Sequence, residues 1–284
     1  MPGLHRDRSP GSDTAYVTLV TNEGYVEGAA ALLRSLAVTG TRADRVVLHT
    51  AAVPQAGLER LAARGARLVQ TDLLETSAAF DTAHARDAVH RAAPFTRGGK
   101  PPFHTPLDNF AKLRLWQLTE YRAVVFIDAD ALVLRNCDRL FAYPEFCAAP
   151  NVYESLADFH RMNSGVFTAR PAQATFDAMM AALDTPGAFW RRTDQTFLQQ
   201  FFPDWHGLPV FCNMLQYVWV NLPELWEWSA IRILHYQYEK PWQVPHPKRD
   251  RLAPLIDLWQ AFAGDGPVPD LAALPGPPAS HRAA

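Results

Sequence analysis

The sequence has few cysteines and no strong charge of either sign. Its three cysteines, Cys137, Cys147 and Cys212, are too scattered for a disulfide framework or a Cys-x-x-Cys metal site. They favour small buried thiols in a reducing compartment. The formal net charge of −2 argues against a nucleic-acid-binding protein, which would usually carry a basic stripe. We therefore expect a cytoplasmic protein that binds no nucleic acid.

Long apolar segments are also missing. The longest apolar runs, at residues 29–33 and 123–127, are far shorter than the roughly 20 residues of a transmembrane helix. The polar stretch 1–13 contains no apolar core, so it does not resemble a signal peptide. We expect no membrane span, and we expect residues 1–13 to form a flexible leader.

Three motifs of common enzyme classes are absent. The sequence has no GxxxxGK[ST] phosphate loop and no GxGxxG after its first apolar run, which argues against P-loop kinases and dinucleotide-dependent dehydrogenases. It also lacks the GxSxG turn of the α/β-hydrolases.

What the sequence does contain is a regular alternation of apolar runs and amphipathic stretches. Short apolar runs predict strands, and stretches with one apolar face predict helices. In chain order we expect a strand at 15–20, a helix at 25–38, a strand at 45–49, a helix at 54–64 and a strand at 66–69. This order is typical of an α/β fold with a Rossmann-like, mainly parallel sheet flanked by helices.

The second part of the chain continues this pattern after a long polar excursion at residues 76–105, which we expect to be a loop beside the functional site. Further elements are predicted at 107–120 (helix), 123–127 (strand), 164–168 (strand), 171–183 and 194–201 (helices) and 231–234 (strand). We expect one catalytic domain over residues 14–262 and a disordered Pro/Ala-rich tail at 263–284.

Asp128 and Asp130 directly follow the apolar run 123–127. In an extended segment, residues two apart point to the same side, so both carboxylates can face one cation. Oxygen ligands suit Mn²⁺ or Mg²⁺, and open α/β sheets bind ligands where their strands end. A bare Asp-x-Asp is also typical of a solvated turn. The apolar residues on both sides favour the metal site, because two enclosed carboxylates repel each other unless a positive charge lies between them.

His235 and Lys240 are the partners that we expect for this acidic pair. His235 ends a short apolar run and could add an imidazole nitrogen to the two carboxylates, a ligand set that Mn²⁺ accepts. Lys240 would supply a compact positive charge to a diphosphate. Each residue alone would more often be structural.

Five blocks of residues occur in the order found in glycosyltransferase family 8, and the sequence resembles that family from about residue 16 to residue 242. Together, in this order, they are highly specific. The family includes glycogenin, galactinol synthase and bacterial lipopolysaccharide galactosyl- and glucosyltransferases. The blocks are Val17-Thr-Leu-Val-Thr-Asn-Glu-Gly-Tyr25, Ala111-Lys-Leu-Arg-Leu-Trp116, Phe126-Ile-Asp-Ala-Asp130, Asn163-Ser-Gly-Val-Phe167 with Asp194-Gln195, and His235 with Lys240-Pro-Trp242.

The resemblance implies a GT-A fold, a UDP-sugar donor (UDP-galactose or UDP-glucose), Mn²⁺ with Mg²⁺ as the alternative, and transfer with retention of anomeric configuration. It assigns the metal to Asp128, Asp130 and His235. It assigns the chemistry at the sugar to Asp194, Gln195 and Lys112. The donor-binding residues that it implies are Leu19, Thr21, Asn22, Tyr25, Lys112, Asp128, Ala129, Asn151, Asn163, Ser164 and Lys240.

Retention has two explanations that the sequence leaves open. One is front-face attack through an oxocarbenium-like state, and the other is a covalent intermediate on Asp194. In both, Lys112, Lys240 and the metal would stabilise the charge on departing UDP.

The main expectation is therefore a retaining transferase that moves galactose or glucose to a hydroxyl of a small acceptor such as a sugar, an inositol or an aminocyclitol. A self-glycosylating protein is an alternative, but Trp219 and Asn221 stand where a glycogenin-like chain would carry its acceptor tyrosine, and Tyr217 is out of register. A donor-binding protein or donor hydrolase without transferase activity is a second alternative. A homodimer is one possible assembly. Arg191 and the Trp-rich segment 205–242 are the expected acceptor side.

Overall fold

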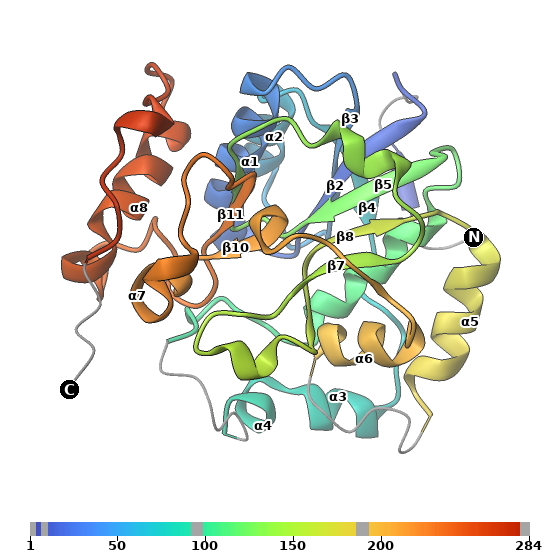
Figure 1. Cartoon of the computed structure of the whole chain (residues 1–284). Helices are drawn as coiled ribbons and strands as arrows, with labels where there is room; N and C mark the ends of the chain where they lie inside the picture. The colour runs from blue at the N-terminus through green and yellow to red at the C-terminus, as the bar shows by residue number, and fades with distance from the viewer. Residues whose placement is uncertain (1–3, 7–10, 92–98, 186–192, 279–284) are drawn as a thin grey trace.

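The computed structural model describes residues 4–6, 11–91, 99–185 and 193–278 of the chain. Arg191 lies outside the described residues. The described chain forms a single α/β unit built around one large sheet (Figure 1). Its eight strands are β1 (Leu4–Arg6), β2 (Thr14–Val20), β3 (Asp44–His49), β4 (Arg67–Thr71), β5 (Ala123–Ile127), β7 (Cys147–Pro150), β8 (Met162–Ala169) and β9 (His206–Gly207).

The sheet has the order β1-β4-β3-β2-β5-β8-β7-β9. Its centre, β4-β3-β2-β5, is parallel, as the strand–helix alternation predicts. β8 runs antiparallel to both β5 and β7, which the sequence did not indicate, because an apolar run carries no information on strand direction. The prediction of an α/β fold with helices around a Rossmann-like sheet is confirmed.

Helices cover both faces of the sheet, so the fold has three layers. The α-helices are α1 (Val26–Val38), α2 (Gln55–Ala63), α3 (Ala78–His84), α4 (Arg86–Arg91), α5 (Gln173–Leu183), α6 (Asp194–Phe201), α7 (Val218–Asn221) and α8 (Arg249–Ala263). The 3₁₀ segments are η1 (Glu23–Tyr25), η2 (Asp108–Gln117), η3 (Asp138–Ala142), η4 (Leu156–Asp158), η5 (Val210–Asn213), η6 (Pro223–Leu225) and η7 (Leu271–Ala273).

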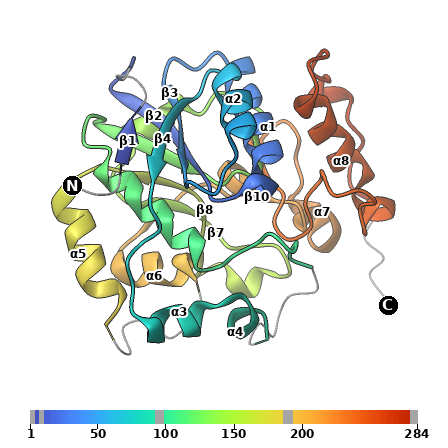
Figure 2. The same cartoon turned by 180° about the vertical axis from the view of Figure 1, so that it is seen from behind.

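The alternation of side chains along β2 shows how the layers form. Val17 and Leu19 pack with η2, α5 and α6 on one face of the sheet. Tyr16 and Val20 point to the other face, where α1 and α2 pack. α8 packs against α1 at one end of the molecule, and α5 lies at the opposite end in both views (Figure 2).

A small second sheet joins the C-terminal part of the chain to the end of β5. It contains β6 (Ala131–Val133), β10 (Met214–Leu215) and β11 (Ile233–His235) in the order β10-β11-β6. β11 is antiparallel to β6, and His235 lies opposite Ala131. This register brings the end of a late strand next to the residues that follow β5.

The segment predicted as a helix at 107–120 is the 3₁₀ segment η2. Residues 110–116 are all buried, so the segment has no exposed face, and the pattern of apolar residues does not distinguish the two helix types. The polar excursion at 76–105 contains the two short helices α3 and α4.

Both ends of the described chain contain more structure than their composition predicts. Within the expected leader, β1 pairs antiparallel with β4. At the other end, residues 264–278 contact the domain instead of standing free as the composition of the tail suggests. Val268, Leu271 and Leu274 pack on the cluster around α7 and α8, and the indole N–H of Trp228 donates to the carbonyl oxygen of Pro275 at 2.8 Å. These apolar contacts account for the order of the segment.

Candidate active site

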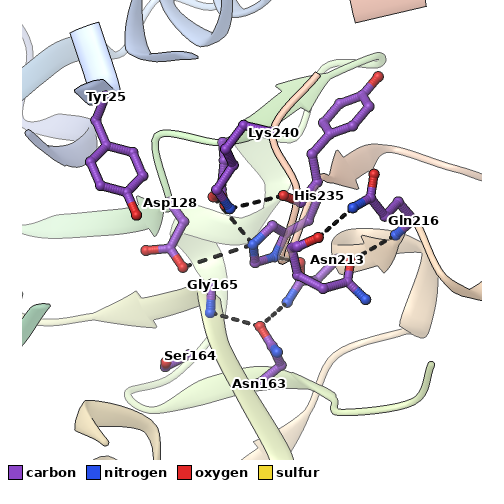
Figure 3. Close-up of polar contacts among 12 residues, drawn as sticks. Tyr25, Asp128, Asn163, Ser164, Gly165, Asn213, Gln216, His235 and Lys240 are labelled. Carbon is purple, nitrogen blue, oxygen red and sulfur yellow. Dashed lines mark hydrogen bonds and ion pairs between the residues drawn. The ribbon is translucent and has the colours of Figure 1, made fainter. Parts of the chain in front are cut away.

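The acidic pair lies in a tight turn between β5 and β6. Figure 3 shows Asp128 facing the ring of His235. The backbone N–H of Asp128 donates to the carbonyl oxygen of Gly165 at 2.8 Å, and the N–H of Ala131 donates to the carbonyl oxygen of Asp128 at 3.2 Å. Ala129 is buried against α1. A Cβ atom at Gly28 would lie 2.5 Å from the carbonyl oxygen of Ala129, so glycine allows α1 to approach the turn. The turn is therefore held from two sides.

His235 joins the two carboxylates because of the strand register. The N–H of the next residue, Tyr236, donates to the carbonyl oxygen of Asp130 at 2.8 Å. The Nε2 atom of His235 lies 3.2 Å from Oδ1 of Asp130 and 4.0 Å from Oδ2 of Asp128. One potential ligand atom from each of the three residues falls within 4.8 Å of the others. The structure thus assembles the three predicted ligands, and an O, O, N donor set fits Mn²⁺.

Lys240 forms a buried ion pair with Asp130, and its ammonium group also donates to the carbonyl oxygen of Tyr236 at 3.0 Å. Burial opposes ionisation of Asp130, but Lys240 and His235 outweigh it and hold the pKa of this carboxyl well below its usual range. The side chain of Asp128 is more open, at 31% exposed. Its pKa is raised by burial, in spite of Lys112. Asp130 is therefore the firmly ionised member of the pair.

Lys112 connects this cluster to Asp194. Its ammonium group lies 3.2 Å from Oδ1 of Asp128 and 2.8 Å from Oδ2 of Asp194, and it also lies 4.7 Å from the centre of the Phe126 ring. The hydroxyl of Ser164 donates to the same Asp194 oxygen at 2.8 Å. Burial opposes the charge of Lys112, but the two carboxylates prevail and raise its pKa. Lys112 therefore carries a fixed positive charge between two acids.

The amides beside the cluster form a connected chain. The amide group of Asn163 donates to Oδ1 of Asn151 at 2.8 Å. The NH₂ group of Asn213 donates in turn to Oδ1 of Asn163 at 2.8 Å. The Oδ1 atom of Asn213 lies 2.9 Å from Nδ1 of His235. Gln195 accepts from the backbone N–H of Ser164 at 3.3 Å. The structure therefore brings the predicted sugar-side residues into direct contact with one another.

The segment expected to bind uridine lies at the end of β2. The side chain of Leu19 is part of the buried core, and Thr21 is buried at the strand end. Asn22 accepts from the N–H of Gly24 at 3.0 Å and donates to the carbonyl oxygen of Phe103 at 3.0 Å.

Tyr25 lies on the Asp128 side of the cluster (Figure 3). Burial, with Asp130 and Asp128 nearby, raises its pKa well above the usual range. Its hydroxyl lies 2.9 Å from Nδ1 of His104, and its ring makes an edge contact with Phe103. The polar excursion thus reaches the site, as the sequence predicts.

Lys100 is a site residue that the sequence reasoning did not single out. Its ammonium group lies 4.8 Å from the centre of the Tyr238 ring. Burial, followed by the charge of Lys240, lowers its pKa to about 8. The guanidinium of Arg86 donates to the backbone carbonyl oxygen of Lys100 at 3.2 Å. The side chain of Glu239 accepts from the backbone N–H of Gly99 at 2.6 Å. The feature of the sequence that could have indicated Lys100 is its position in the stiff run Gly98-Gly-Lys-Pro-Pro102 within the polar excursion.

The Trp-rich segment is mostly part of the core. Trp219, Trp226 and Trp228 are buried and pack against one another with ring centres 5.1–6.0 Å apart. Tyr217 is 7% exposed, and its hydroxyl donates to Glu239 at 2.5 Å. None of these four residues presents a free side chain to solvent.

No helix among the described residues is long and apolar enough to cross a membrane. The cysteines, all three of which are described, are free and buried.

Comparison with curated proteins finds relatives that share most of the domain. The chain is 32% identical over 238 residues to UDP-glucuronate:xylan alpha-glucuronosyltransferase 2 of Arabidopsis thaliana, and the matched region covers 80% of this chain and 35% of that protein. It is 30% identical over 249 residues to glycogenin-1 of Oryctolagus cuniculus, and the matched region covers 84% of this chain and 68% of that protein. The chain spans about a third of the length of the xylan glucuronosyltransferase.

Solved structures give the same fold. The structure of galactosyltransferase LgtC in complex with donor and acceptor sugar analogs superposes with a TM-score of 0.59 at 14% identity, over 86% of this chain and 95% of that one. This likeness shows the GT-A glycosyltransferase fold, whose members usually use a nucleotide-sugar donor and a divalent metal.

Residues 16–244 match the family described as "Glycosyl transferase family 8". This match spans most of the chain and contains each of the five blocks of residues. It also contains the Asp128, Asp130 and His235 cluster. The chain belongs to glycosyltransferase family 8.

Proposed function

We propose that the protein is a retaining glycosyltransferase that moves galactose or glucose from UDP to a hydroxyl of a small acceptor, such as a sugar, an inositol or an aminocyclitol. The proposal includes Mn²⁺ as the metal, with Mg²⁺ as the alternative. It also places the reaction in the cytoplasm, which three free buried cysteines support.

One observation carries this proposal. The ammonium group of Lys112 contacts both Asp128, in the three-residue metal cluster, and Asp194, beside Ser164. A group that binds a diphosphate and a group that acts on the attached sugar must lie this close together, because the bond that breaks joins the two parts of the donor. A site for a free metal ion alone would not need the second acid.

The residues divide into a diphosphate side and a sugar side. Asp128, Asp130 and His235 would hold the metal, which when bound neutralises the charge of the diphosphate. Lys112 and Lys240 would stabilise the developing charge on the leaving UDP. Asp194 is fixed in orientation by its contacts with Lys112 and Ser164, so its carboxylate would stabilise positive charge at the anomeric carbon. Gln195 would also stabilise the anomeric centre. Asn151, Asn163 and Ser164 would contact the hydroxyls of the sugar.

The nucleoside would bind at the end of β2. Tyr25 would stack on the uracil ring, beside Leu19, Thr21 and Asn22. The position of Tyr25 on the Asp128 side of the cluster supports this proposal (Figure 3).

A uronic acid donor is a second candidate, and two observations favour it. Curated relatives of this chain are named UDP-glucuronate:xylan alpha-glucuronosyltransferases, at 32% identity for three of them. The ammonium group of Lys100 forms no ion pair with a carboxylate among the described residues. It would be available to a sugar carboxylate. The same donor screen tests both candidates.

A donor screen by thermal unfolding tests the proposal. UDP-galactose, UDP-glucose, UDP-glucuronate and matching GDP-sugars would each be added with Mn²⁺. A donor at 100 times its dissociation constant adds roughly 2.7 kcal/mol, so we expect a UDP-sugar to raise the melting temperature by about 5 °C. A shift with GDP-sugars alone would contradict the proposed nucleotide.

Intact-mass spectrometry separates the transferase from its two alternatives. After incubation with the bound UDP-sugar and Mn²⁺ we expect an unchanged protein mass, because the hydroxyl of Tyr217 is buried and bonded to Glu239. A gain of one hexose would favour self-glycosylation. UDP release that no hydroxyl acceptor accelerates would favour a donor hydrolase.

A further inference from the structure

Asn213 is a fully buried residue that touches both halves of the site. It ends η5, immediately before β10, and β10 pairs with the strand that carries His235. Its exposed fraction is 0%. In Figure 3 its amide lies between the ring of His235 and the side chain of Asn163. A buried amide whose oxygen and nitrogen both have partners can fix the orientation of each partner.

The backbone of Gly165 determines the direction of every bond in this chain. A backbone N–H can only donate, and that of Gly165 donates to the side chain of Asn163 at 2.9 Å, so the accepting atom is the Asn163 oxygen. The atom of Asn213 that contacts this oxygen at 2.8 Å must therefore be its NH₂ group. The remaining atom of Asn213 is its oxygen, which lies 2.9 Å from Nδ1 of His235. Nδ1 must carry the proton.

This assignment leaves the other ring nitrogen of His235 with its lone pair. In the neutral ring, Nε2 then faces Oδ1 of Asp130 at 3.2 Å and Oδ2 of Asp128 at 4.0 Å. A lone pair that faces carboxylate oxygens is repelled by them unless a cation lies between, which is either a bound metal or, without metal, a second proton on Nε2. The tautomer set through Asn213 is therefore the one that a metal ligand requires.

The same chain determines what Asn163 offers to a sugar. Its oxygen already accepts from Gly165 and Asn213, and its NH₂ group donates one hydrogen to Asn151. A second N–H of Asn163 remains to donate, for example to a hydroxyl oxygen.

We propose that Asn213 is a positioning residue, which sets the tautomer of His235 through its oxygen and the orientation of Asn163 through its NH₂ group. The inference rests on the metal and donor roles proposed above for these two neighbours. It connects the metal ligands to the sugar side of the site through one side chain.

Two substitutions separate the two bonds. Asn213→Asp keeps an oxygen for His235 and places a second oxygen against Asn163, so only the sugar-side bond is lost. Asn213→Ala removes both bonds. Asn221→Asp is the matched control, because Asn221 is exposed and lies outside the amide chain. Circular dichroism and thermal unfolding would verify that each variant folds.

The first readout is the histidine ring without any metal. In ¹⁵N spectra of the metal-free protein at neutral pH, we expect the His235 ring protonated at Nδ1 in the wild type, in Asn213→Asp and in the control. Asn213→Ala should show a mixture of tautomers. A wild-type His235 ring that carries its proton on Nε2 alone, with Nδ1 unprotonated, would overturn the inference. Because this readout needs neither metal nor donor, it stands even if the proposed function fails.

The second readout is binding. Calorimetric titration with Mn²⁺ should show Asn213→Asp within a few-fold of the wild type and Asn213→Ala roughly 10–100-fold weaker. With Mn²⁺ saturating, both variants should lose most of the difference in affinity between UDP and the UDP-sugar, while the control keeps it. Equal Mn²⁺ affinity in Asn213→Ala and the wild type would overturn the inference. A wild type that binds neither Mn²⁺ nor any UDP-sugar would instead contradict the proposed function.

Discussion

The imidazole ring of His235 packs directly on the backbone of Gly165. A Cβ atom at position 165 would lie 2.3 Å from Cε1 and 2.5 Å from Nδ1 of that ring. No side chain fits at these distances, so glycine is required for β8 and the ring to approach each other. The third residue of the Asn163-Ser-Gly165 block thus makes room for His235 of the metal cluster, while the first two belong to the proposed sugar side.

Gly165→Ala should therefore weaken metal binding. The added methyl group must displace the His235 ring or β8, because both are buried and neither can give way easily. We expect Mn²⁺ affinity to fall by roughly 10–100-fold and stability to fall by about 1–3 kcal/mol. Calorimetry and chemical denaturation measure the two effects. Gly207→Ala is the control, since a Cβ atom there meets no atom within 4 Å. Unchanged Mn²⁺ affinity in Gly165→Ala would show that the contact does not matter.

Lys112→Met should destabilise the metal-free protein. Lys112 is 3% exposed and lies between Asp128 and Asp194, so its removal leaves two enclosed carboxylates without their cation. Breaking a buried ion pair in this way costs about 3–5 kcal/mol. Denaturant unfolding with and without Mn²⁺ measures the loss, and we expect Mn²⁺ to restore part of it.

The exposed ion pair between Arg122 and Asp13 provides the comparison for Lys112. Its side chains are 61% and 66% exposed, so Arg122→Met should cost less than about 1 kcal/mol. Equal losses for the two variants would mean that the pair at Lys112 is screened by solvent like a surface pair.

Donor affinity should depend on pH through Lys100. Burial and the charge of Lys240 lower the pKa of Lys100 to about 8, so its ammonium is present below that pH and is lost as the pH rises through it. Because the unfolded chain keeps its proton up to a higher pH, this group contributes stability that increases as the pH rises above 8. Affinity for an anionic UDP-sugar should move the opposite way and fall by about tenfold between pH 7 and pH 9.

Lys100→Arg isolates this effect, because a guanidinium stays charged over the whole range. Titrations of the wild type and the variant at several pH values provide the measurement. The wild type should lose affinity between pH 7 and pH 9, and the variant should lose much less. Parallel losses in both proteins would assign the pH dependence to another group.

The sequence predicted those parts of the site that depend on local pattern. The acids at the end of the apolar run 123–127 lie where a parallel strand ends, and strand ends collect ligands in α/β sheets. His235 also ends a strand, and its pairing with β6 brings it to Asp130. The resemblance supplied Lys112 and Asp194, which the structure joins in an ion pair.

What the sequence did not predict depends on the tertiary structure. Asn213 stands in no recognisable motif, and its importance follows only from its burial between two side chains that are 22 and 50 residues away. Lys100 lies in a polar stretch that periodicity does not place, and its surroundings come from Tyr238 and Glu239, far along the chain. The antiparallel direction of β8 likewise follows from chain topology, not from its composition.

The central claim is that Asp128, Asp130 and His235 hold a divalent cation on which donor binding depends. Its most direct test is calorimetric titration of a UDP-sugar into the EDTA-treated protein before and after Mn²⁺ is restored. The same titration on Asp130→Ala, and on Asp177→Ala as an exposed control, completes the measurement. We predict tight binding only with Mn²⁺ in the wild type and in Asp177→Ala, and a loss of roughly 100-fold or more in Asp130→Ala. Equal donor affinity with and without Mn²⁺ in the wild type would contradict the account.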